Sequence, residues 1–352
     1  MDLIEQFVYM SKYAGMREDL IQAGGGNSSV KLDGCKMLIK ASGIQLADIT
    51  QEAGYATVNP EIIVEYFNEE AMHSGEPDEK AVLNACLLGG ARPSIETFLH
   101  SATDVFTLHT HPMVVNVLTA RKNGMQVLHE LFPEALLIDY ATPGIKLAKE
   151  YFEACKNSSN SGAVAFELIF LKNHGLIVSG KTGEEVIRKT EEVLAKIENY
   201  LAITMTPYHD VTRIYNAFRE AKIAGDELII YLATDSNVRK AVKKFAAALW
   251  AFWFCPDCLV YCGKRPLVLT DDFSSEEIRA HVLKYGQPVI IYYQENIYIA
   301  ANSVKKAKEI ESVLAFSAQV AILNESCEMD LLSEQEQNFL LDWESEKYRK
   351  NL

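Results

Sequence analysis

The sequence predicts an α/β protein made of two units, and three observations lead to this prediction. Short apolar runs rich in β-branched residues alternate with segments whose apolar residues recur at helical spacing. A strand, turn, strand, turn and long helix follow one another at residues 168–203, and the same order returns at residues 289–323. With 352 residues, the chain also exceeds the length of one typical domain.

The composition is typical of a soluble globular protein, with 49% hydrophobic and 23% charged residues. The formal net charge of −14 argues against nucleic acid as a partner, since no basic stripe compensates for it. A small anionic substrate is compatible with this charge, because a local group of backbone N–H donors can bind phosphate inside an acidic protein.

The sequence favours a cytoplasmic location. Residues 1–6 show no basic region followed by an apolar core, so we expect no signal peptide. We expect no membrane contact, because no apolar run is long enough to span a bilayer. The seven cysteines are odd in number and irregularly spaced, which is typical of reduced thiols.

The N-terminal part is predicted to contain a helix (residues 2–20), a small-residue turn (24–29) and a hairpin with strands at 30–32 and 36–40. A second small-residue turn, Ala41–Gly43, follows. If both turns lie at the ends of adjacent strands, their backbone amides and hydroxyls converge and can hold an anion. Ordinary hairpin turns explain the same residues, because glycine-rich stretches alone are weak evidence.

Helices are expected at residues 60–73 and 77–90, and residues 92–97 open another helix that carries His100. Glu96 lies near the start of this helix, where a carboxylate commonly caps backbone N–H groups. The alternative is a general base beside a metal ion. Spacing alone favours the cap.

Three histidines lie where predicted strands end. Residues 104–111 have the pattern of a strand, and side chains on a strand alternate between its faces, so His109 and His111 project from the same side. His174 follows the apolar run 168–171 at a turn. Two imidazoles one pleat apart and a third strand-end histidine can share one divalent metal, whereas a single histidine there would be an ordinary polar residue.

Three helices complete the first unit. They are predicted from Pro112 to about Arg121, from Ile145 to about Cys155 and from Glu184 to about Ile203. The turn Tyr140–Gly144 precedes the second of them.

The second unit has the pattern of a degenerate copy of the first. Residues 289–303 repeat the rhythm of residues 168–182, and a long helix follows in both cases. We therefore predict a catalytic domain at residues 1–212, a degenerate copy at 213–330 and a helical tail at 331–352.

The predicted copy lacks the metal ligands. Residues 256–268, interpreted as containing a strand, can be laid on residues 102–114. In that overlay the places of the three histidines are taken by Gly263, Arg265 and Glu295.

A cysteine cluster lies in the same region. Cys255, Cys258 and Cys262 form a C-x2-C-x3-C pattern. Structural zinc usually takes four ligands in two spaced pairs, and no fourth partner is evident in the sequence. Buried free thiols are therefore favoured over a zinc site.

Five segments, in this order, resemble motifs of the class II aldolase/adducin family. They are Gly24–Lys31, Lys40–Gly43, Arg92–His100, His109–Pro112 and Lys172–Leu176. The resemblance is closest to the aldolase half of fusion proteins in which a rhamnulose-1-phosphate aldolase precedes a short-chain dehydrogenase. Those proteins have a similar Gly-Gly-Gly-Asn turn, and the block and linker that follow their aldolase domain look like parts of this chain.

The resemblance implies a three-layer α/β/α fold around a mostly antiparallel sheet. It implies that His109, His111 and His174 bind a divalent metal, most often Zn²⁺, with Mn²⁺ or Co²⁺ as alternatives. It changes the interpretation of Glu96 from cap to catalytic acid/base. No NAD site is expected, because the chain ends where the dehydrogenase would begin and shows no Gly-x-Gly-x-x-Gly fingerprint.

The resemblance also implies a sugar or sugar-phosphate substrate. The residues expected to bind it are Gly26, Asn27, Ser28, Lys40, Ser42, Gly43 and Ser94. One position departs from the family pattern, because Ile95 stands where many sugar-phosphate aldolases carry a second serine. Tyr140 is a candidate for the acid that protonates the leaving fragment.

The implied function is reversible aldol cleavage of a ketose 1-phosphate through a metal-stabilised enediolate. Epimerases, dehydratases and decarboxylases are alternatives on the same scaffold, since a fold does not fix the reaction. A non-catalytic adducin-like scaffold is an alternative of another class, although a scaffold has no reason to keep the histidines and the glutamate. A homo-oligomer, tetramer or dimer, is expected from the family.

Overall fold

The computed structural model describes residues 1–33, 35–68, 78–158, 166–223, 225, 227–246 and 253–342. The chain divides into two compact units, Met1–Met205 and Thr206–Leu352. Each unit has its own sheet and is described by itself.

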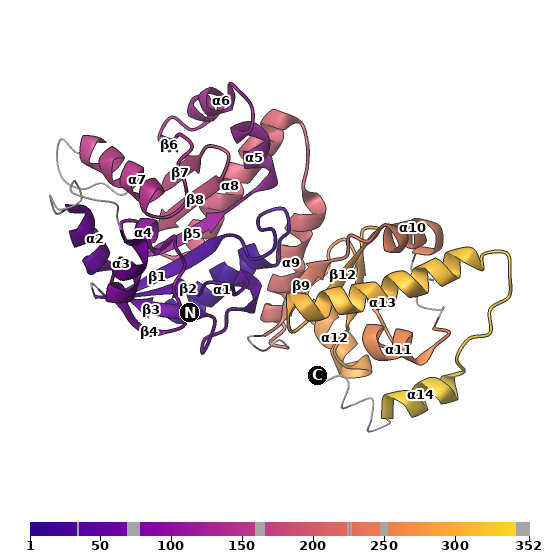
Figure 1. The fold of residues 1–352 in the computed structure, drawn as a ribbon. Coiled ribbons are helices and arrows are strands. Elements are labelled where there is room, and N and C mark those ends of the chain that lie inside the picture. The colour runs from indigo at the N-terminus through magenta and orange to yellow at the C-terminus, as the bar shows by residue number, and fades with distance from the viewer. Residues whose placement is uncertain are drawn as a thin grey trace. The chain divides into compact units, whose positions relative to one another are not determined.

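The first unit is built on an eight-stranded sheet with the strand order β4-β3-β2-β1-β5-β8-β7-β6 (Figure 1). The strands are β1 (Asn27–Asp33), β2 (Lys36–Lys40), β3 (Tyr55–Val58), β4 (Leu87–Gly90), β5 (Phe106–Thr110), β6 (Leu136–Ile138), β7 (Leu168–Leu171) and β8 (Gly175–Gly180). All neighbours pair antiparallel except β6 and β7. The sheet is therefore mostly antiparallel, as expected.

Helices cover both faces of this sheet and give three layers. One face packs against α1 (Leu3–Gly15), α5 (Met113–Thr119), α6 (Gly124–Leu131) and α8 (Gly183–Leu201). The other packs against α2 (Pro60–Asn68), α3 (Glu79–Cys86), α4 (Thr97–His100) and α7 (Ile145–Ser158). The alternation along β2 shows how one strand serves both cores: Leu38 faces the first group of helices, whereas Met37 and Ile39 face the second.

The expected helix at residues 77–90 is shorter than predicted. It ends at Cys86, and residues 87–90 form strand β4, in which Gly89 pairs with Thr57. The run Leu-Leu-Gly-Gly has no helical period, and two glycines weaken a helix, so the chain extends at this point. Residues 69–73 of the neighbouring predicted helix lie outside the described part of the chain.

The second unit contains a four-stranded sheet with the order β10-β11-β12-β9. Its strands are β9 (Ile229–Leu232), β10 (Leu267–Val268), β11 (Ile290–Tyr293) and β12 (Asn296–Ala301). Its helices are α9 (Thr206–Glu220), α10 (Ser236–Phe245), α11 (Pro256–Cys262), α12 (Ser275–Tyr285), α13 (Val304–Leu323) and α14 (Glu334–Asp342). Residues 343–352 of the predicted tail are not among the described ones.

The second sheet has the topology of half of the first sheet. In both, a parallel pair (β6 and β7, or β10 and β11) is followed by an antiparallel hairpin, and an earlier strand lies on the far side of that hairpin. A long helix leaves the hairpin in both cases, α8 in the first unit and α13 in the second. This shared order agrees with a duplicated segment, which stays a prediction.

The topology corrects the overlay of the two segments. Strand β9 pairs with β12 as β5 pairs with β8, so β9 takes the place of the His-x-His strand. Residues Pro256–Cys262 form helix α11 rather than a strand. Counting along the paired strands puts Leu232 and Thr234, not Gly263 and Arg265, at the positions of the two histidines.

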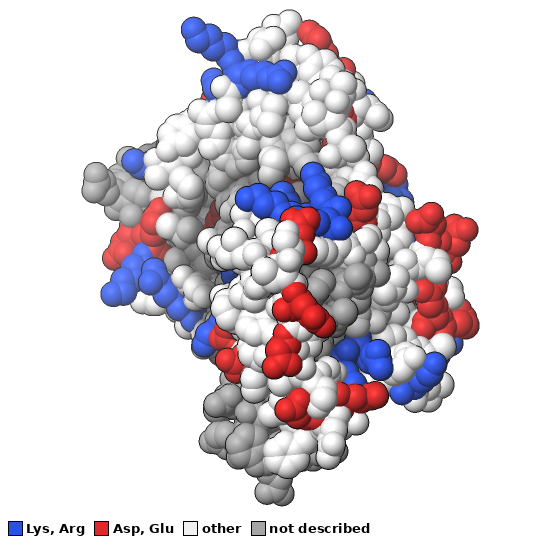
Figure 2. Space-filling view, turned by 90° about the vertical axis from the view of Figure 1, so that its right-hand side faces the viewer, with Lys and Arg blue, Asp and Glu red and all other residues white. Residues whose placement is uncertain are grey.

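Charged side chains of both signs are interspersed over the face shown in Figure 2, without one continuous basic surface. Among the described residues, no helix combines the length and the apolar character that crossing a membrane requires.

Candidate metal centre and active site

The fold brings the three histidines together at one end of the first sheet. His109 lies in β5, His111 follows that strand, and His174 lies in the turn between β7 and β8. The turn meets the end of β5 because Thr110 pairs with Leu176. Asn173, which directs the turn, has a positive φ of 54°, a conformation that asparagine tolerates better than most residues.

The spacing of the imidazoles fits a shared metal ion. The Nε2 atom of His109 lies 3.1 Å from Nε2 of His111 and 3.3 Å from Nε2 of His174. Nitrogen ligands about 2.05 Å from a tetrahedral centre are about 3.3 Å apart. One potential ligand atom from each histidine lies within 4.8 Å of the others, and this is the one such group found in the described part of the chain. The three histidines could therefore hold a divalent metal.

Burial lowers the pKa of all three imidazoles and so favours the neutral form, which is the form that binds a metal. Burial, and then the neighbouring His111 and His174, holds the pKa of His109 well below its usual value. Burial and the charge of His174 lower the pKa of His111 to about 4. The Nδ1–H of His109 donates to the carbonyl of Leu176 at 3.1 Å, which leaves its Nε2 lone pair directed at the centre.

Two glycines give the His111 ring its space. A Cβ on Gly25 would lie 3.0 Å from the Cε1 atom of His111, and a Cβ on Gly175 would lie 3.0 Å from its Cδ2 atom and 2.2 Å from the carbonyl oxygen of Thr110. The His111 ring therefore lies between the turn before β1 and the start of β8. The backbone N–H of His111 donates to the carbonyl of Leu20 at 2.8 Å.

Glu96 lies directly at the centre. Its Oε1 atom is 3.3 Å from Nε2 of His109 and 3.6 Å from Nε2 of His174. It occupies the N-cap position of α4 but makes no side-chain capping bond, so the capping interpretation does not hold, and its role as a general base stays a prediction. Burial raises the pKa of Glu96 to about 7, while Lys40 and a hydrogen bond from Asn27 lower it.

One of the predicted small-residue turns, Ala41–Gly43, meets another turn, residues 92–94, beside this centre. Ala41 forms an isolated bridge with Pro93, and the N–H of Ser42 donates to the carbonyl of Arg92 at 2.9 Å. The turn 41–43 therefore lies against the turn 92–94. Ser42 and Gly43 are exposed, and Gly43 has a φ of +85°, which favours glycine. Ser94 accepts a hydrogen bond from the N–H of Glu96 at 3.3 Å, which ties this turn to the centre.

Lys40 connects the turn 41–43 with the glycine-rich turn before β1 through hydrogen bonds of its buried side chain. It is 3% exposed, and its Nζ donates to the carbonyls of Ile44 (2.7 Å) and Gly24 (3.4 Å). It thereby connects the second turn with the glycine-rich turn before β1. Burial lowers the pKa of Lys40, and the nearby Glu96 raises it. Gly26 has a φ of +68°, and a Cβ there would meet Ile21 at 2.2 Å.

The structure corrects the prediction for Ser28. Its Oγ lies 2.7 Å from Oγ of Ser11 on α1, and it is fully buried, so its side chain faces the helix layer rather than the centre. Asn27 and Ser28 are successive residues of a strand and therefore face opposite sides. Asn27 is the one directed at Glu96.

Tyr140 is 64% exposed on the segment after β6. In the described structure no hydrogen bond joins it to the three histidines or to Glu96. Its role in catalysis stays a prediction.

The sequence interpretation missed residues that support the site from behind. His100 is fully buried, its Nδ1 lies 2.7 Å from Oγ of Ser29, and burial and Lys31 lower its pKa to about 3. Arg17 is also fully buried and pairs with Asp19 and with a carboxylate of α8. One signal in the sequence could have indicated that Arg17 is buried. It is a charged residue that lies between two apolar segments, near the end of a predicted helix.

Comparisons with known proteins place the first unit in a family. The model of the family "Class II Aldolase and Adducin N-terminal domain" matches residues 5–201. The uncharacterized oxidoreductase YuxG of Bacillus subtilis (strain 168) is 28% identical over 212 residues, which are 56% of this chain and 29% of that protein. This chain therefore spans less than a third of the length of that relative.

Two solved structures resemble the first unit. One is the N-terminal class II aldolase domain of a conserved protein from Thermoplasma acidophilum, with 24% identity, 57% of this chain and 94% of that chain covered, and a TM-score of 0.49. Another is an L-fuculose 1-phosphate aldolase, with 18% identity, 61% and 96% covered, and a TM-score of 0.40. The family match covers more than half of the chain and agrees with the motifs in the sequence. The chain belongs to the class II aldolase and adducin N-terminal domain family.

Proposed function

We propose that this protein is a metal-dependent carbon–carbon lyase that cleaves a ketose 1-phosphate in a reversible aldol reaction. The observation that carries the proposal is the approach of the Glu96 carboxylate to His109 and His174 at 3.3 and 3.6 Å, at the end of the sheet where three histidine nitrogens converge. A carboxylate that leaves its helix uncapped to lie beside a metal-binding group is arranged for chemistry rather than for stability.

We propose Zn²⁺ as the resident metal, held by His109, His111 and His174. Three neutral imidazoles form a common catalytic zinc set, and they leave coordination positions free for substrate. When bound, the metal supplies a Lewis acid that stabilises negative charge on a substrate oxygen. Mn²⁺ and Co²⁺ fit the same nitrogen ligands.

The residues of the chain would divide the remaining work. Glu96 would accept and return the proton, because it is the carboxylate nearest to the three histidines. Asn27 and Lys40 would orient and charge-balance that carboxylate. The turns 41–43 and 92–94, in which Ser42 is exposed and Ser94 half-buried, would bind the phosphate through backbone N–H groups and the hydroxyls of these two serines. With Ile95 in place of a second serine, this phosphate site would have one donor fewer.

Two alternatives remain within the same site. An epimerase, dehydratase or decarboxylase would use the same histidines and Glu96 on another substrate. A homo-oligomer in the cytoplasm is our expectation for any of these enzymes, with Tyr140 approaching a substrate as the proton donor. An adducin-like scaffold would not need the arrangement of Glu96 beside three histidines.

Cleavage of a panel of ketose 1-phosphates by the metal-loaded protein tests the proposal. Aldehyde and dihydroxyacetone phosphate should form, and Glu96→Gln should slow turnover by at least about a hundredfold while metal content stays the same. The exposed Glu192→Gln on α8 is a matched control and should behave as wild type. Cleavage of no panel member by the metal-loaded protein would refute the aldolase and leave the other reactions of this site.

A further inference from the structure

The second unit contains a cavity of about 400 Å³ at the end of β12 and the start of α13. Its lining includes the apolar residues Val289, Ala300 and Ile310 and the cationic residues Lys264, Arg265 and Lys306. This volume is in the range of pockets for small molecules. The cavity is lined by residues of the second unit, and none of them has a role in the function proposed above.

The first unit has a cavity of about 570 Å³ whose lining includes two of the corresponding positions, Glu167 and Lys189. The correspondence follows from the backbone: the N–H of Ser179 donates to the carbonyl of Glu167, and the N–H of Ala300 donates to the carbonyl of Val289, both at 2.8 Å. Val289 therefore stands where Glu167 stands.

The two long helices extend the correspondence. The side chain of Thr182 caps α8 by accepting from the N–H of Glu185, and the side chain of Ser303 caps α13 by accepting from the N–H of Lys306. Lys306 therefore stands where Glu185 stands. Ile310 lies four residues after Lys306, just as Lys189 lies four residues after Glu185. Ile310 therefore stands where Lys189 stands, one turn further along the helix.

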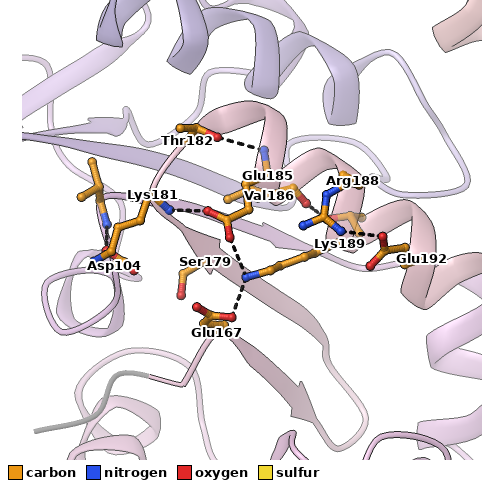
Figure 3. A network of polar contacts seen from close by, with 12 residues as sticks. Asp104, Glu167, Ser179, Lys181, Thr182, Glu185, Val186, Arg188, Lys189 and Glu192 are labelled. Carbon is orange, nitrogen blue, oxygen red and sulfur yellow. Dashed lines mark hydrogen bonds and ion pairs between the residues drawn. The ribbon is translucent and has the colours of Figure 1, made fainter.

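In the first unit these positions form a partly exposed ion-pair network, which Figure 3 shows. The Nζ atom of Lys189 lies 2.5 Å from a carboxylate oxygen of Glu167 and 3.1 Å from one of Glu185. Lys189, which lines the first cavity, is therefore paired with two carboxylates, of which Glu167 lines the cavity as well.

In the second unit, the three positions that correspond to Glu167, Glu185 and Lys189 carry other residues. Val289 and Ile310 remove one anion and the central cation, and Lys306 turns an anion into a cation. The second cavity is therefore lined by three cationic side chains and by no aspartate or glutamate among the described residues. This is unusual in a protein with a net charge of −14.

The cations are only weakly compensated by neighbours. Lys264 lies 3.6 Å from Glu334, which is 76% exposed, and Lys306 lies 3.4 Å from Glu309, which is 43% exposed. Such solvent-screened pairs hold little energy and yield readily to a better partner. Among the described residues, no carboxylate lies within ion-pair distance of Arg265.

We propose that this cavity binds a small organic phosphate. The phosphate group would lie between Arg265 and Lys306, because a dianion needs more than one cation and the arginine fork can bind two of its oxygens. The carbon part would lie on Val289 and Ile310, which the first unit does not offer at this place. The second unit would then be a ligand-binding module in which the metal centre is replaced by a new site at the other end of its hairpin.

Titration calorimetry with phenyl phosphate tests this site, because the probe combines an anion with an apolar ring. In the full-length, metal-loaded protein, phenyl phosphate should bind at least about fivefold more tightly than inorganic phosphate, and phenol alone should bind weakly. The double variant Arg265→Glu and Lys306→Glu should weaken phenyl phosphate at least about tenfold. Lys240→Glu, an exposed charge change on α10, should leave the affinity within about twofold.

A second double variant distinguishes binding in the cavity from attraction of the anion by the overall charge of the protein. Val289→Glu with Ile310→Lys rebuilds the ion pair of the first unit without changing the net charge, and it should also abolish binding while the protein keeps a cooperative melting transition. Binding that survives both double variants and is lost in Ser94→Glu would locate the probe at the first unit and overturn the proposal. Absence of any binding to the wild-type protein would overturn it as well, and neither result would affect the proposed lyase function.

Discussion

Replacing Arg17 by methionine should destabilise the first unit and loosen its metal centre. Arg17 is 0% exposed and donates to both carboxylate oxygens of Asp19, at 3.0 and 2.6 Å, and to Glu191 of α8. These contacts hold the segment after α1, whose carbonyls at Asp19 and Leu20 accept the N–H groups of Met113 and His111.

The expected cost follows from what the substitution leaves behind. Methionine fills most of the space of the arginine stem but leaves Asp19 buried and 4% exposed at its side chain, without its cation. Breaking a buried pair by removing one partner costs about 3–5 kcal/mol. For a unit of this size, that corresponds to a fall in Tm of roughly 6–20 °C, at about 2–4 °C per kcal/mol.

The same substitution at Arg188 is the matched control. Arg188 pairs with Glu192 on α8 at 2.6 Å, but the two side chains are 59% and 61% exposed. Arg188→Met should therefore cost less than about 1 kcal/mol. Differential scanning calorimetry of both variants, with and without metal, measures the difference. Equal losses in the two variants would refute the assignment of Arg17 as the buried anchor of the segment that holds His111.

Three other substitutions test separate parts of the structure. Gly175→Ala should lower metal affinity at least about tenfold, measured by competition with a chelator, because its Cβ would lie 2.2 Å from the carbonyl oxygen of Thr110 and 3.0 Å from the His111 ring; unchanged affinity would contradict the packing described. His100→Gln should reduce the acid sensitivity of the protein. The pKa of His100 is about 3 in the folded state, so below pH 6.5 the unfolded state binds a proton that the folded state does not, and wild type should lose about 2 kcal/mol more than the variant between pH 6.5 and 5 in urea unfolding. A variant that loses stability as steeply as wild type would show that His100 is not kept neutral. Ser28→Ala should leave KM unchanged, since its hydroxyl contacts Ser11; a severalfold rise in KM would restore it to the substrate site.

The convergence of the three histidines was predictable because it depends on local periodicity. His109 lies in β5 and His111 directly follows its end, and an extended backbone places residues two apart on one face. His174 needed only a turn at the end of a second strand, and the pairing of Thr110 with Leu176 brings that turn to the right place.

The role of Glu96 could not be predicted from its position in the sequence alone. A carboxylate at the start of a helix has the same sequence pattern whether it caps that helix or points away from it, and only the three-dimensional structure shows that it makes no capping bond. The prediction for Ser28 failed for a different reason. Alternation along β1 rules out a shared direction for Asn27 and Ser28, so the residues alone could have excluded one of them.

The second unit was harder to align with the first from sequence, because a short apolar run can form either a strand or a short helix. The segment Pro256–Cys262 has seven residues and fits either a strand or two turns of helix. The strand that does occupy the place of β5 is Ile229–Leu232, and its identity depends on its pairing with β12, a long-range contact that local patterns do not report. Arg17 was missed for a similar reason, since its partner on α8 is distant in sequence.

Metal content tests the central claim most directly. The wild-type protein, purified without chelator and then dialysed against metal-free buffer, should retain about one divalent metal ion per chain by plasma mass spectrometry. His109→Ala should retain none, and removal of the metal from wild type should lower the Tm, since a ligand at about a hundred times its Kd stabilises the folded state by about 2.7 kcal/mol. Equal metal content in wild type and His109→Ala, or none in either, would contradict the assignment of the three histidines as a metal centre.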